Sequence, residues 1–306
     1  MKVAVIGSGS FGIALTHLLV KNNNDVKIWS YTEEEKNLIN NEHKCKYLNN
    51  YLINEKVICS NDYNEVINDT DYIVLVSPSN TIRNICRNIK NIITCQEIII
   101  ASKGIENDKL MSDIVKEELN KDVSIISGPS HAEQIVKDVL TFVEYSGNKN
   151  INKLFETKKF KMIYNEDSIG MQIGGVLKNL VSLSVGIAEG LNYESNTISY
   201  IITEGLNEIK EIGLKMGAKE STFYGLSGLG DLITTSFSDD SRNKRAGKLI
   251  ANGMSLDEID TIEGLNNLKS VKVIINKYNI DCKLINSLYN IIYNDKDVKS
   301  LLSFCE

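Results

Sequence analysis

The sequence predicts an α/β fold in which a doubly wound parallel sheet is followed by an all-helical region. Short apolar segments of strand length alternate with helical segments over the first 165 residues, which is typical of a parallel sheet. A glycine-rich turn directly follows the first of these segments. After Asn165 the strand pattern stops and helical periodicity continues. We therefore expect two domains, at residues 1–165 and 166–306.

Length and composition narrow the class of protein. The 306 residues suit two domains that each bury a core, and 42% hydrophobic with 24% charged residues is ordinary for a globular protein. The formal net charge of −6 gives no basic footprint for nucleic acid. Six cysteines without a CxxC pair and only three histidines favour reduced thiols and no metal site. Because the first apolar run is too short for an export signal, we expect a cytoplasmic protein.

The glycine-rich turn occupies residues 7–12, Gly-Ser-Gly-Ser-Phe-Gly, between a strand at 3–6 and a helix that ends near Lys21. This is the dinucleotide fingerprint in its required setting. Gly7 permits the tight turn, Gly9 lets the backbone approach a pyrophosphate, and Gly12 lets the helix pack on the strand. The helix N-terminus offers free N–H groups to phosphates. The turn predicts a Rossmann domain that binds NADH or NADPH; the alternative is a glycine-rich turn without a ligand.

The end of the second strand, at 26–29, bears on the choice between these cofactors. An acid there holds the ribose 2′-hydroxyl of NAD, whereas an arginine accommodates the 2′-phosphate of NADP. Trp29–Thr32 carries neither, and the first acid, Glu33, is expected to begin the next helix. Since no acid would repel a 2′-phosphate, we predict that NADPH is used and that NADH is not excluded.

Small polar clusters follow three further strands, at 71–76, 97–101 and 123–127. The clusters are Ser77-Pro78-Ser79, Ser102-Lys103-Gly104 and Gly128-Pro129-Ser130-His131-Ala132. Ligands of open α/β sheets bind at the carboxyl ends of the strands, so Lys103 is a candidate contact to substrate or cofactor. For His131, at the expected start of the next helix, a supporting or surface role is favoured over catalysis. Two last strands, at 140–145 and 161–164, are expected to be partly antiparallel.

One long helix, at 168–190, is apolar on nearly every face, and such a helix is normally buried. Lys178 and Asn179 lie in its middle. A buried ammonium loses hydration, so its pKa falls unless something compensates, which makes Lys178 a candidate proton acceptor. The alternative is a lysine that reaches the surface from a core helix. The polar residues, together with Gln172, argue against a membrane span.

Two stretches of the helical region could complete a site. Residues 225–231 are Gly-Leu-Ser-Gly-Leu-Gly-Asp, in which three glycines allow backbones to approach closely and Asp231 could hold Lys178 in place. Residues 238–245 open another helix. There Arg242 and Asn243 would suit a phosphate, through a bidentate fork and the helix N-terminus. The alternative is an exposed, charged first turn.

Together these motifs resemble those of the soluble, bacterial-type NAD(P)-dependent glycerol-3-phosphate dehydrogenases. The resemblance covers nearly the whole chain and rests on GSGSFG, SKG, SGPSHAE, GGVLKN, GLGDL and SRNKR, in this order. It implies a Rossmann domain followed by an all-helical domain, with the site between them. It also implies reversible reduction of dihydroxyacetone phosphate to sn-glycerol 3-phosphate for glycerophospholipid synthesis, by a homodimer without membrane insertion.

The resemblance also implies roles for individual residues. Lys178 matches the proton acceptor and Asp231 the substrate-binding acid beside it. We expect Lys103 to lower the pKa of Lys178 by like-charge repulsion and to stabilise the developing charge. The positions matching substrate contacts are Lys103, Gly128, Ser130, Lys178, Asn179, Asp231, Ser241, Arg242 and Asn243. Those expected to contact the cofactor, besides the three glycines, are Ser10, Phe11, Tyr31, Lys103, Ala132, Arg242 and Glu263.

Two rival interpretations remain. A related Lys-Asn dehydrogenase could act on a β-hydroxyacid or a ketopantoate-like acid, and substrate assays would distinguish it. A cofactor-sensing binding protein without turnover would have no need of Lys178, Asp231 and Arg242 together. The chain also departs from the family at Leu140 and near Cys282-Lys283, where proline is usual, and at Ser30-Tyr31, where arginine or histidine often follows the second strand.

Overall fold

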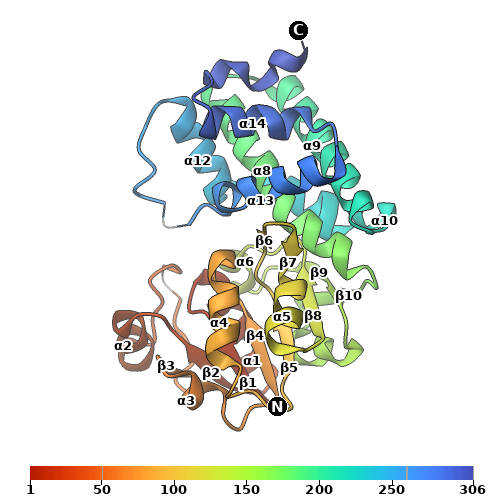
Figure 1. The fold of residues 1–306 in the computed structure, drawn as a ribbon. Coiled ribbons are helices and arrows are strands. Elements are labelled where there is room, and N and C mark those ends of the chain that lie inside the picture. Colours follow the sequence, from red (N-terminus) through yellow and green to blue (C-terminus); the bar gives the residue numbers. More distant parts are fainter. Residues whose placement is uncertain (50, 260, 306) are drawn as a thin grey trace. The chain divides into compact units, whose positions relative to one another are not determined.

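The computed structural model describes residues 1–49, 51–259 and 261–305, and the chain forms two compact units (Figure 1). Unit 1 comprises Met1–Ser102 and Met111–Ser168. Unit 2 comprises Lys103–Leu110 and Ile169–Glu306. The final change of unit falls at Ser168, close to the boundary expected after residue 165. The earlier excursion of Lys103–Leu110 into unit 2 was not predicted, because its short polar segments carry no clear periodicity.

Within the described part of unit 1 the strands form one eight-stranded sheet, in the order β10-β9-β8-β5-β4-β1-β2-β3. The strands are β1 (Lys2–Ile6), β2 (Asp25–Trp29), β3 (Ile58–Ser60), β4 (Tyr72–Leu75), β5 (Glu97–Ile100), β8 (Val123–Ser127), β9 (Thr141–Ser146) and β10 (Phe160–Tyr164). Strands β1 to β5 and β8 are mutually parallel, β9 is antiparallel to β8, and β10 is parallel to β9. The doubly wound sheet is therefore confirmed. Strand β3 was missed because it is too short to show alternation.

Helices cover both faces of this sheet. On one face α1 (Ser10–Lys21) packs beside α6 (Ala132–Ile135) and α7 (Asn152–Phe155), and on the other α4 (Ile82–Ile89) packs beside α5 (Met111–Leu119) (Figure 1). The remaining helical segments of unit 1 are α2 (Glu33–Glu42), α3 (Tyr63–Ile67), η1 (Ser79–Thr81) and η2 (Lys149–Ile151). Apolar side chains of the sheet are buried beneath both layers, which explains why its strands read as continuous hydrophobic runs.

The order of strands reverses between β1 and β4, which are neighbours in the sheet. The glycine-rich turn follows β1, and Ser77 follows β4. The hydroxyl of Ser77 donates to the carbonyl oxygen of Ile6 at 2.8 Å, which ties the two strand ends together. The turn therefore lies at the topological switch point, where open α/β sheets bind their ligands.

Unit 2 is helical around α8 (Ser168–Gly190) (Figure 1). The other segments are a hairpin of β6 (Ile105–Glu106) and β7 (Lys109–Leu110), then α9 (Ser195–Lys215), α10 (Glu220–Phe223), η3 (Leu226–Gly230), α11 (Asp231–Phe237), α12 (Arg242–Ala251), α13 (Glu263–Tyr278), α14 (Lys283–Tyr293) and η4 (Val298–Cys305). The predicted bounds of α8 are confirmed, and it is buried from Gly170 to Ala188. Among the described helices only α8 is long and apolar enough to cross a membrane, and its apolar window is wholly buried.

Glycines let neighbouring segments approach α8 closely. A Cβ atom at Gly174 would overlap the carbonyl oxygen of Ser227, which belongs to η3. A Cβ atom at Gly186 would overlap the carbonyl oxygen of Lys244 on α12. Any larger residue would push these segments away from α8. The first contact matters for the site, because Gly174 lies one turn before Lys178 on the same helix.

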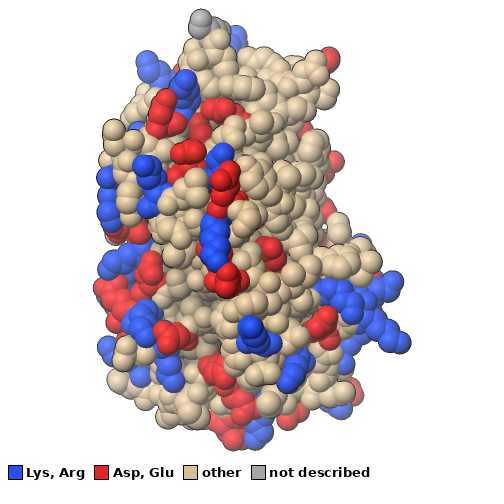
Figure 2. Space-filling view, turned by 90° about the vertical axis from the view of Figure 1, so that its right-hand side faces the viewer, with Lys and Arg blue, Asp and Glu red and all other residues tan. Residues whose placement is uncertain are grey.

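Charged side chains of both signs share the surface. Figure 2 shows one face, on which acidic and basic residues are interspersed. Some form exposed pairs, such as Lys116 with Asp122 at 2.8 Å. Pairs of this kind contribute little to stability, so the folding free energy must come mainly from the two cores.

Candidate active site

The centre of the candidate site in unit 2 is an ion pair between Lys178 and Asp231. Lys178 lies in the middle of α8 and is 8% exposed, and Asp231 is the first residue of α11 and is 1% exposed. The ammonium of Lys178 also donates to the hydroxyl of Thr235 at 2.8 Å. The structure therefore places the carboxylate where the sequence interpretation expected it, beside the buried lysine.

A second ammonium reaches the same carboxylate. The Nζ atom of Lys103 lies 2.6 Å from Oδ2 of Asp231. Sequence analysis assigned Lys103 to the sheet edge of the first domain, whereas the structure places it in unit 2. The reason is the hairpin that follows it. The amide of Ile105 donates to Oδ1 of Asn267 at 2.8 Å, and that of Asn107 to Oγ of Ser270 at 3.0 Å, both on α13.

The three charges alter each other's protonation. Burial lowers the pKa of Lys178 to about 7, with Asp231 opposing the shift and Lys103 adding to it. Burial alone would raise the pKa of Asp231, but the ammonium groups of Lys103 and Lys178 hold it below its usual value. Lys178 therefore populates its neutral and charged forms near neutral pH, as a group that exchanges a proton must.

The turn that presents Asp231 is a π-helix, η3, which sequence analysis did not predict. A π-helical turn is rare and is frequently found at functional sites. It is compact here because Gly228 packs against the backbone of Phe223, where a Cβ atom would overlap the carbonyl oxygen. The three glycines of residues 225–230 were the available signal. Thr235, one turn after Asp231, was also missed, because threonine in a helix has no distinctive pattern.

A second polar group surrounds Asn179, next to Lys178 on α8. The side chain of Asn243 donates to Oδ1 of Asn179 at 2.9 Å and accepts the backbone N–H of Gly264 at 2.8 Å. Both asparagines are buried. This chain of bonds links α8, α12 and the start of α13, so it fixes the first turns of the two later helices.

Ser241 and Arg242 lie at the beginning of α12. Ser241 is the N-cap residue, and its hydroxyl accepts the N–H of Lys244 at 3.2 Å. Arg242 is exposed, and no ion pair links it to another described residue. The helix start therefore has a buried polar side, with Ser241 and Asn243, and an exposed guanidinium.

Glu263, the first residue of α13, belongs to unit 2 as well. Its carboxylate accepts a hydrogen bond from Nδ2 of Asn267 at 3.1 Å. Asn267 also holds the hairpin that carries Lys103. The buried amide of Asn267 thus bonds both to Glu263 and to Ile105, which lies two residues after Lys103.

The predicted cofactor residues of unit 1 form a separate group. Gly7 has φ +133°, a conformation that favours glycine, and a Cβ atom at Gly12 would overlap the carbonyl oxygen of Gly7. A Cβ atom at Gly9 would have no atom within 4 Å. Gly9 is also the N-cap of α1, which has no side-chain cap and no acid in its first turn. Open space beside uncapped N–H groups fits a dinucleotide pyrophosphate.

The other predicted contacts in unit 1 lie around this turn and after β8. Ser10 and Phe11 form the first turn of α1 and are partly buried, and Tyr31, just after β2, is 83% exposed. After β8, Gly128 has φ +141° and its carbonyl oxygen accepts the hydroxyl of Ser130 at 2.9 Å. Ala132, which begins α6, is buried.

His131 precedes α6 as its N-cap residue but makes no side-chain cap bond. Its Nε2 atom is buried and has no hydrogen-bond partner among the described residues. The imidazole is therefore not committed to a structural bond through this atom, and His131 stays the second residue to consider for proton transfer.

Residues 29–32 carry no acid and Glu33 begins α2, as predicted, but a carboxylate of α2 reaches the end of β2. Glu35, in the first turn of α2, folds back so that its Oε2 atom accepts the hydroxyl of Ser30 at 2.7 Å. The sequence of Trp29–Thr32 gives no sign that a residue of the following helix returns to the strand end.

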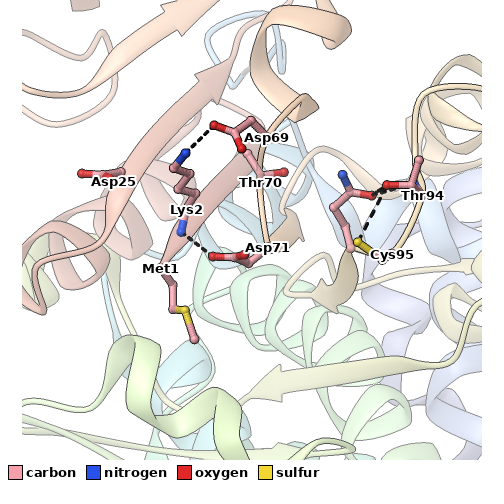
Figure 3. A pocket seen from close by; sticks show the side chains of 9 residues that line it. Met1, Lys2, Asp25, Asp69, Thr70, Asp71, Thr94 and Cys95 are labelled. Atoms are coloured by element: carbon pink, nitrogen blue, oxygen red, sulfur yellow. Dashed lines mark hydrogen bonds and ion pairs between the residues drawn. The ribbon is translucent and has the colours of Figure 1, made fainter.

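A surface pocket of unit 1 lies at the opposite edge of the sheet, beside the amino ends of its strands (Figure 3). Two of its acidic side chains, Asp69 and Asp71, are already bonded to Lys2. Lys2 forms an ion pair with Asp69 through its side chain, and its backbone N–H donates to Asp71 at 2.8 Å. Since ligands of such sheets bind at the carboxyl ends, this pocket is not part of the candidate site.

Comparison with known proteins finds relatives that cover both units. Residues 2–152 match the family described as NAD-dependent glycerol-3-phosphate dehydrogenase N-terminus, and residues 167–303 match the corresponding C-terminus. A glycerol-3-phosphate dehydrogenase (NAD(P)+) of Fusobacterium nucleatum is 41% identical, over 97% of this chain and 94% of its own length. One of Clostridium botulinum is 40% identical, over 98% and 95%. The crystal structure of glycerol-3-phosphate dehydrogenase from Coxiella burnetii superposes with a TM-score of 0.96 at 29% identity, covering 99% of this chain and 98% of that one.

Proposed function

Since the chain belongs to the family of NAD-dependent glycerol-3-phosphate dehydrogenases, we propose that it reduces dihydroxyacetone phosphate reversibly to sn-glycerol 3-phosphate with NADH or NADPH. The observation that carries the proposal is the buried pair of Lys178 and Asp231 with the partly buried Lys103 beside it. A carbonyl that accepts a hydride must also gain a proton, and this group holds one at neutral pH. The product serves glycerophospholipid synthesis.

Lys178 is the proposed proton carrier. When bound, the dinucleotide supplies the hydride for reduction and accepts it in the reverse direction. During reduction the carbonyl oxygen of the substrate gains negative charge, and the protonated Nζ atom of Lys178 donates to it. In oxidation the neutral amine removes the proton of the hydroxyl. A pKa of about 7 gives both forms access to the reaction.

Lys103 and Asp231 support this transfer. The positive charge of Lys103 stabilises the oxyanion as it forms, an effect that is strong in a site shielded from water. Asp231 lies against both ammonium groups and fixes their positions. Without it, the repulsion between two buried cations would drive them apart. Thr235, through its hydroxyl, restricts the rotation of the Lys178 ammonium.

The start of α12 is the proposed phosphate site. Arg242 provides a bidentate, charge-assisted fork, and the N-terminus of α12 adds the favourable end of its dipole. Ser241 and Asn243 shape the polar side of the same turn, with Asn179 behind Asn243. Binding energy from the phosphate orients the carbonyl carbon for reaction.

The cofactor contacts proposed for unit 1 are Gly7, Gly9, Ser10, Phe11, Gly12, Tyr31 and Ala132, and those proposed for unit 2 are Lys103, Arg242 and Glu263. Gly128 and Ser130 remain proposed substrate contacts. The uncapped first turn of α1 supports the pyrophosphate site. We further propose a cytoplasmic homodimer that does not insert into membranes, with the domain division at residue 165.

A substrate assay tests the function. The purified protein is mixed with NADH or NADPH, and loss of reduced cofactor is followed by absorbance with dihydroxyacetone phosphate, ketopantoate or a β-ketoacid. We expect kcat/KM for dihydroxyacetone phosphate to exceed the others by about 10²-fold or more, since only this substrate carries a phosphate that the start of α12 can anchor. Faster turnover of ketopantoate would overturn the proposal, and dinucleotide binding without any turnover would favour a sensor.

Dihydroxyacetone without its phosphate is the matched control substrate. Its reacting carbonyl is the same, but it lacks the remote anchor. Because that anchor orients the carbonyl, we expect kcat to fall together with kcat/KM. An unchanged kcat would place the phosphate outside the start of α12.

A further inference from the structure

A carboxylate from α2 lies between the glycine-rich turn and the end of β2. The Oε2 atom of Glu35 accepts hydrogen bonds from the hydroxyls of Ser8, at 2.6 Å, and Ser30, at 2.7 Å. Its Oε1 atom accepts the hydroxyl of Tyr47 at 3.1 Å. Ser8 belongs to the turn at 7–12, and Ser30 directly follows β2. Glu35 therefore occupies the place where Rossmann domains specific for NAD carry an acid, although it comes from a different segment.

Helix capping does not explain this position. Thr32 is the N-cap residue of α2, and its hydroxyl accepts the N–H of Glu35 at 3.2 Å. In a capping box the third helical residue, a glutamate, would reach back to the N–H of the cap residue. Here the carboxylate of Glu35 turns instead towards the serines of the turn and the strand. The orientation of the Glu35 carboxylate is therefore set by its bonds to Ser8 and Ser30, not by a capping bond within α2.

The carboxylate has acceptor capacity to spare. An ionised carboxylate offers about four acceptor positions and no donor. Oε2 uses two of them, for Ser8 and Ser30, and Oε1 uses one, for Tyr47. One position on Oε1 remains for a hydroxyl. A phosphate offers only acceptor oxygens at neutral pH, so it would meet Glu35 with repulsion and no hydrogen bond.

The surrounding charges act in the same direction. Glu33, Glu34 and Glu35 all lie in the first turn of α2. Lys36, the cation in the same segment, forms an ion pair with Glu33. The first arginine of the chain is Arg83, far beyond this segment in sequence. An added 2′-phosphate at this place would therefore lie beside the three carboxylates of α2, of which Lys36 pairs with one.

We propose that Glu35 determines cofactor specificity, by accepting a hydrogen bond from the ribose 2′-hydroxyl of NADH and repelling the 2′-phosphate of NADPH. The inference rests on the proposed function only in taking the glycine-rich turn as the dinucleotide site. It reverses the preference for NADPH that Trp29–Thr32 suggested, because the missing acid is supplied by the following helix.

Binding of each dinucleotide without substrate tests the proposal, since it needs no turnover. NADH and NADPH are titrated separately into the wild type, Glu35→Gln and Glu34→Gln, and Kd is obtained from cofactor fluorescence. The wild type should bind NADH at least about tenfold more tightly than NADPH. Glu35→Gln should bring the two constants within about threefold, chiefly by tightening NADPH.

Glu34→Gln is the matched control. It removes the same charge from the same turn of α2, but Glu34 is exposed and does not hydrogen-bond to Ser8 or Ser30. Its NADPH-to-NADH ratio should stay close to that of the wild type. Thermal unfolding of each variant shows whether unit 1 is intact. A variant that unfolds is replaced by Glu35→Asp, which keeps the charge and should keep the preference for NADH.

Three results would overturn the inference. One is equal binding of NADH and NADPH by the wild type. Another is an equal change of the NADPH-to-NADH Kd ratio in Glu35→Gln and Glu34→Gln, which would mean that the preference depends only on the net charge of this turn. The third is a failure of either dinucleotide to bind, and it would also overturn the proposed function. In the first two cases the proposed function stands, so the two failures can be told apart.

Discussion

The two units build their candidate sites in contrasting ways. In unit 1 the proposed pyrophosphate site is made of backbone, from six consecutive residues whose glycines leave space at a helix N-terminus. In unit 2 it is made of buried charges, and Lys103 and Asp231 are 128 residues apart in sequence. A backbone site fails when atoms are added, whereas a charge site fails when charges are removed. Substitutions in the two units should therefore fail differently, and a substitution outside both sites should leave the reaction unchanged.

Replacing Lys178 by methionine should have the largest effect. The side chain keeps its length and loses its charge, so the buried helix α8 should tolerate it. Losing a general acid/base costs about 10²–10⁴-fold in kcat, and loss of the cation beside the oxyanion adds to this. NADH binding, measured by fluorescence titration, should persist.

Lys244→Met is the matched control, because Lys244 is another buried lysine of unit 2 and pairs with Glu189 at 3.1 Å instead of Asp231. Its kcat should stay close to that of the wild type even if its stability falls. A Lys178→Met enzyme whose kcat remains within about tenfold of wild type would exclude Lys178 as the proton carrier, and His131 would then be the next residue to test.

A pair of alanine substitutions probes the backbone site. At Gly12 the new Cβ atom would overlap the carbonyl oxygen of Gly7, so we expect a loss of about 1–3 kcal/mol in the free energy of unfolding. At Gly9 the Cβ atom meets nothing, so stability should be unchanged. The methyl group instead fills the space beside the N–H groups of α1, and NADH affinity should fall about tenfold. Urea unfolding and NADH titration of both variants separate the two effects.

If Gly9→Ala bound NADH as tightly as the wild type, the open space beside α1 would not be the pyrophosphate site, and unit 1 would not hold a site made of backbone.

Removing Lys103 should move the pH profile. Neutral Lys178 is the base for glycerol 3-phosphate oxidation, so kcat should rise as the pH passes about 7, and reduction should fall over the same range. Lys103 helps to lower the pKa of Lys178, so Lys103→Gln should shift the rising limb to higher pH. Lys103→Arg keeps the charge and should leave the limb in place. A limb that stays at the same pH in Lys103→Gln would show that burial alone sets this pKa.

The smallest effect on the reaction is expected at Glu208, a buried acid outside both groups. Its carboxylate accepts the N–H groups of Leu284, at 2.7 Å, and Ile285, at 3.0 Å, and so caps α14. Burial raises its pKa from 4.5 to about 7. Since the folded protein holds this proton more tightly, its stabilising contribution is full below pH 4.5 and is lost as the pH rises to 7.

Glu208→Gln should therefore flatten the decline in unfolding free energy between pH 4.5 and 7, by on the order of 1–3 kcal/mol, while kcat stays unchanged. Urea titrations of both proteins at several pH values measure this. Parallel pH curves for the two proteins would contradict the assignment.

The same contrast explains how much the sequence could predict. The turn at 7–12 and the buried helix α8 are local patterns, and both were placed correctly, α8 to its end residues. The pairing of Asp231 with Lys178 could be predicted because the glycines before Asp231 indicated that backbone segments pack closely there. The return of Glu35 to Ser30 was missed, because a glutamate at a helix start has a common local explanation. The π-helix η3 was missed because no periodicity distinguishes it from a glycine-rich loop.

The hairpin after Lys103 restricts how this gene could be rearranged. Its segment is encoded within the first half of the chain, yet its partners are Asn267 and Ser270 of the second half. A fragment encoding only residues 166–306 would lack one of the two cations that Asp231 holds. A recombinant that exchanged the C-terminal half with a distant relative would inherit a hairpin matched to another α13. The two halves are therefore matched to each other at this hairpin, and an exchange of one half alone should disturb the position of Lys103.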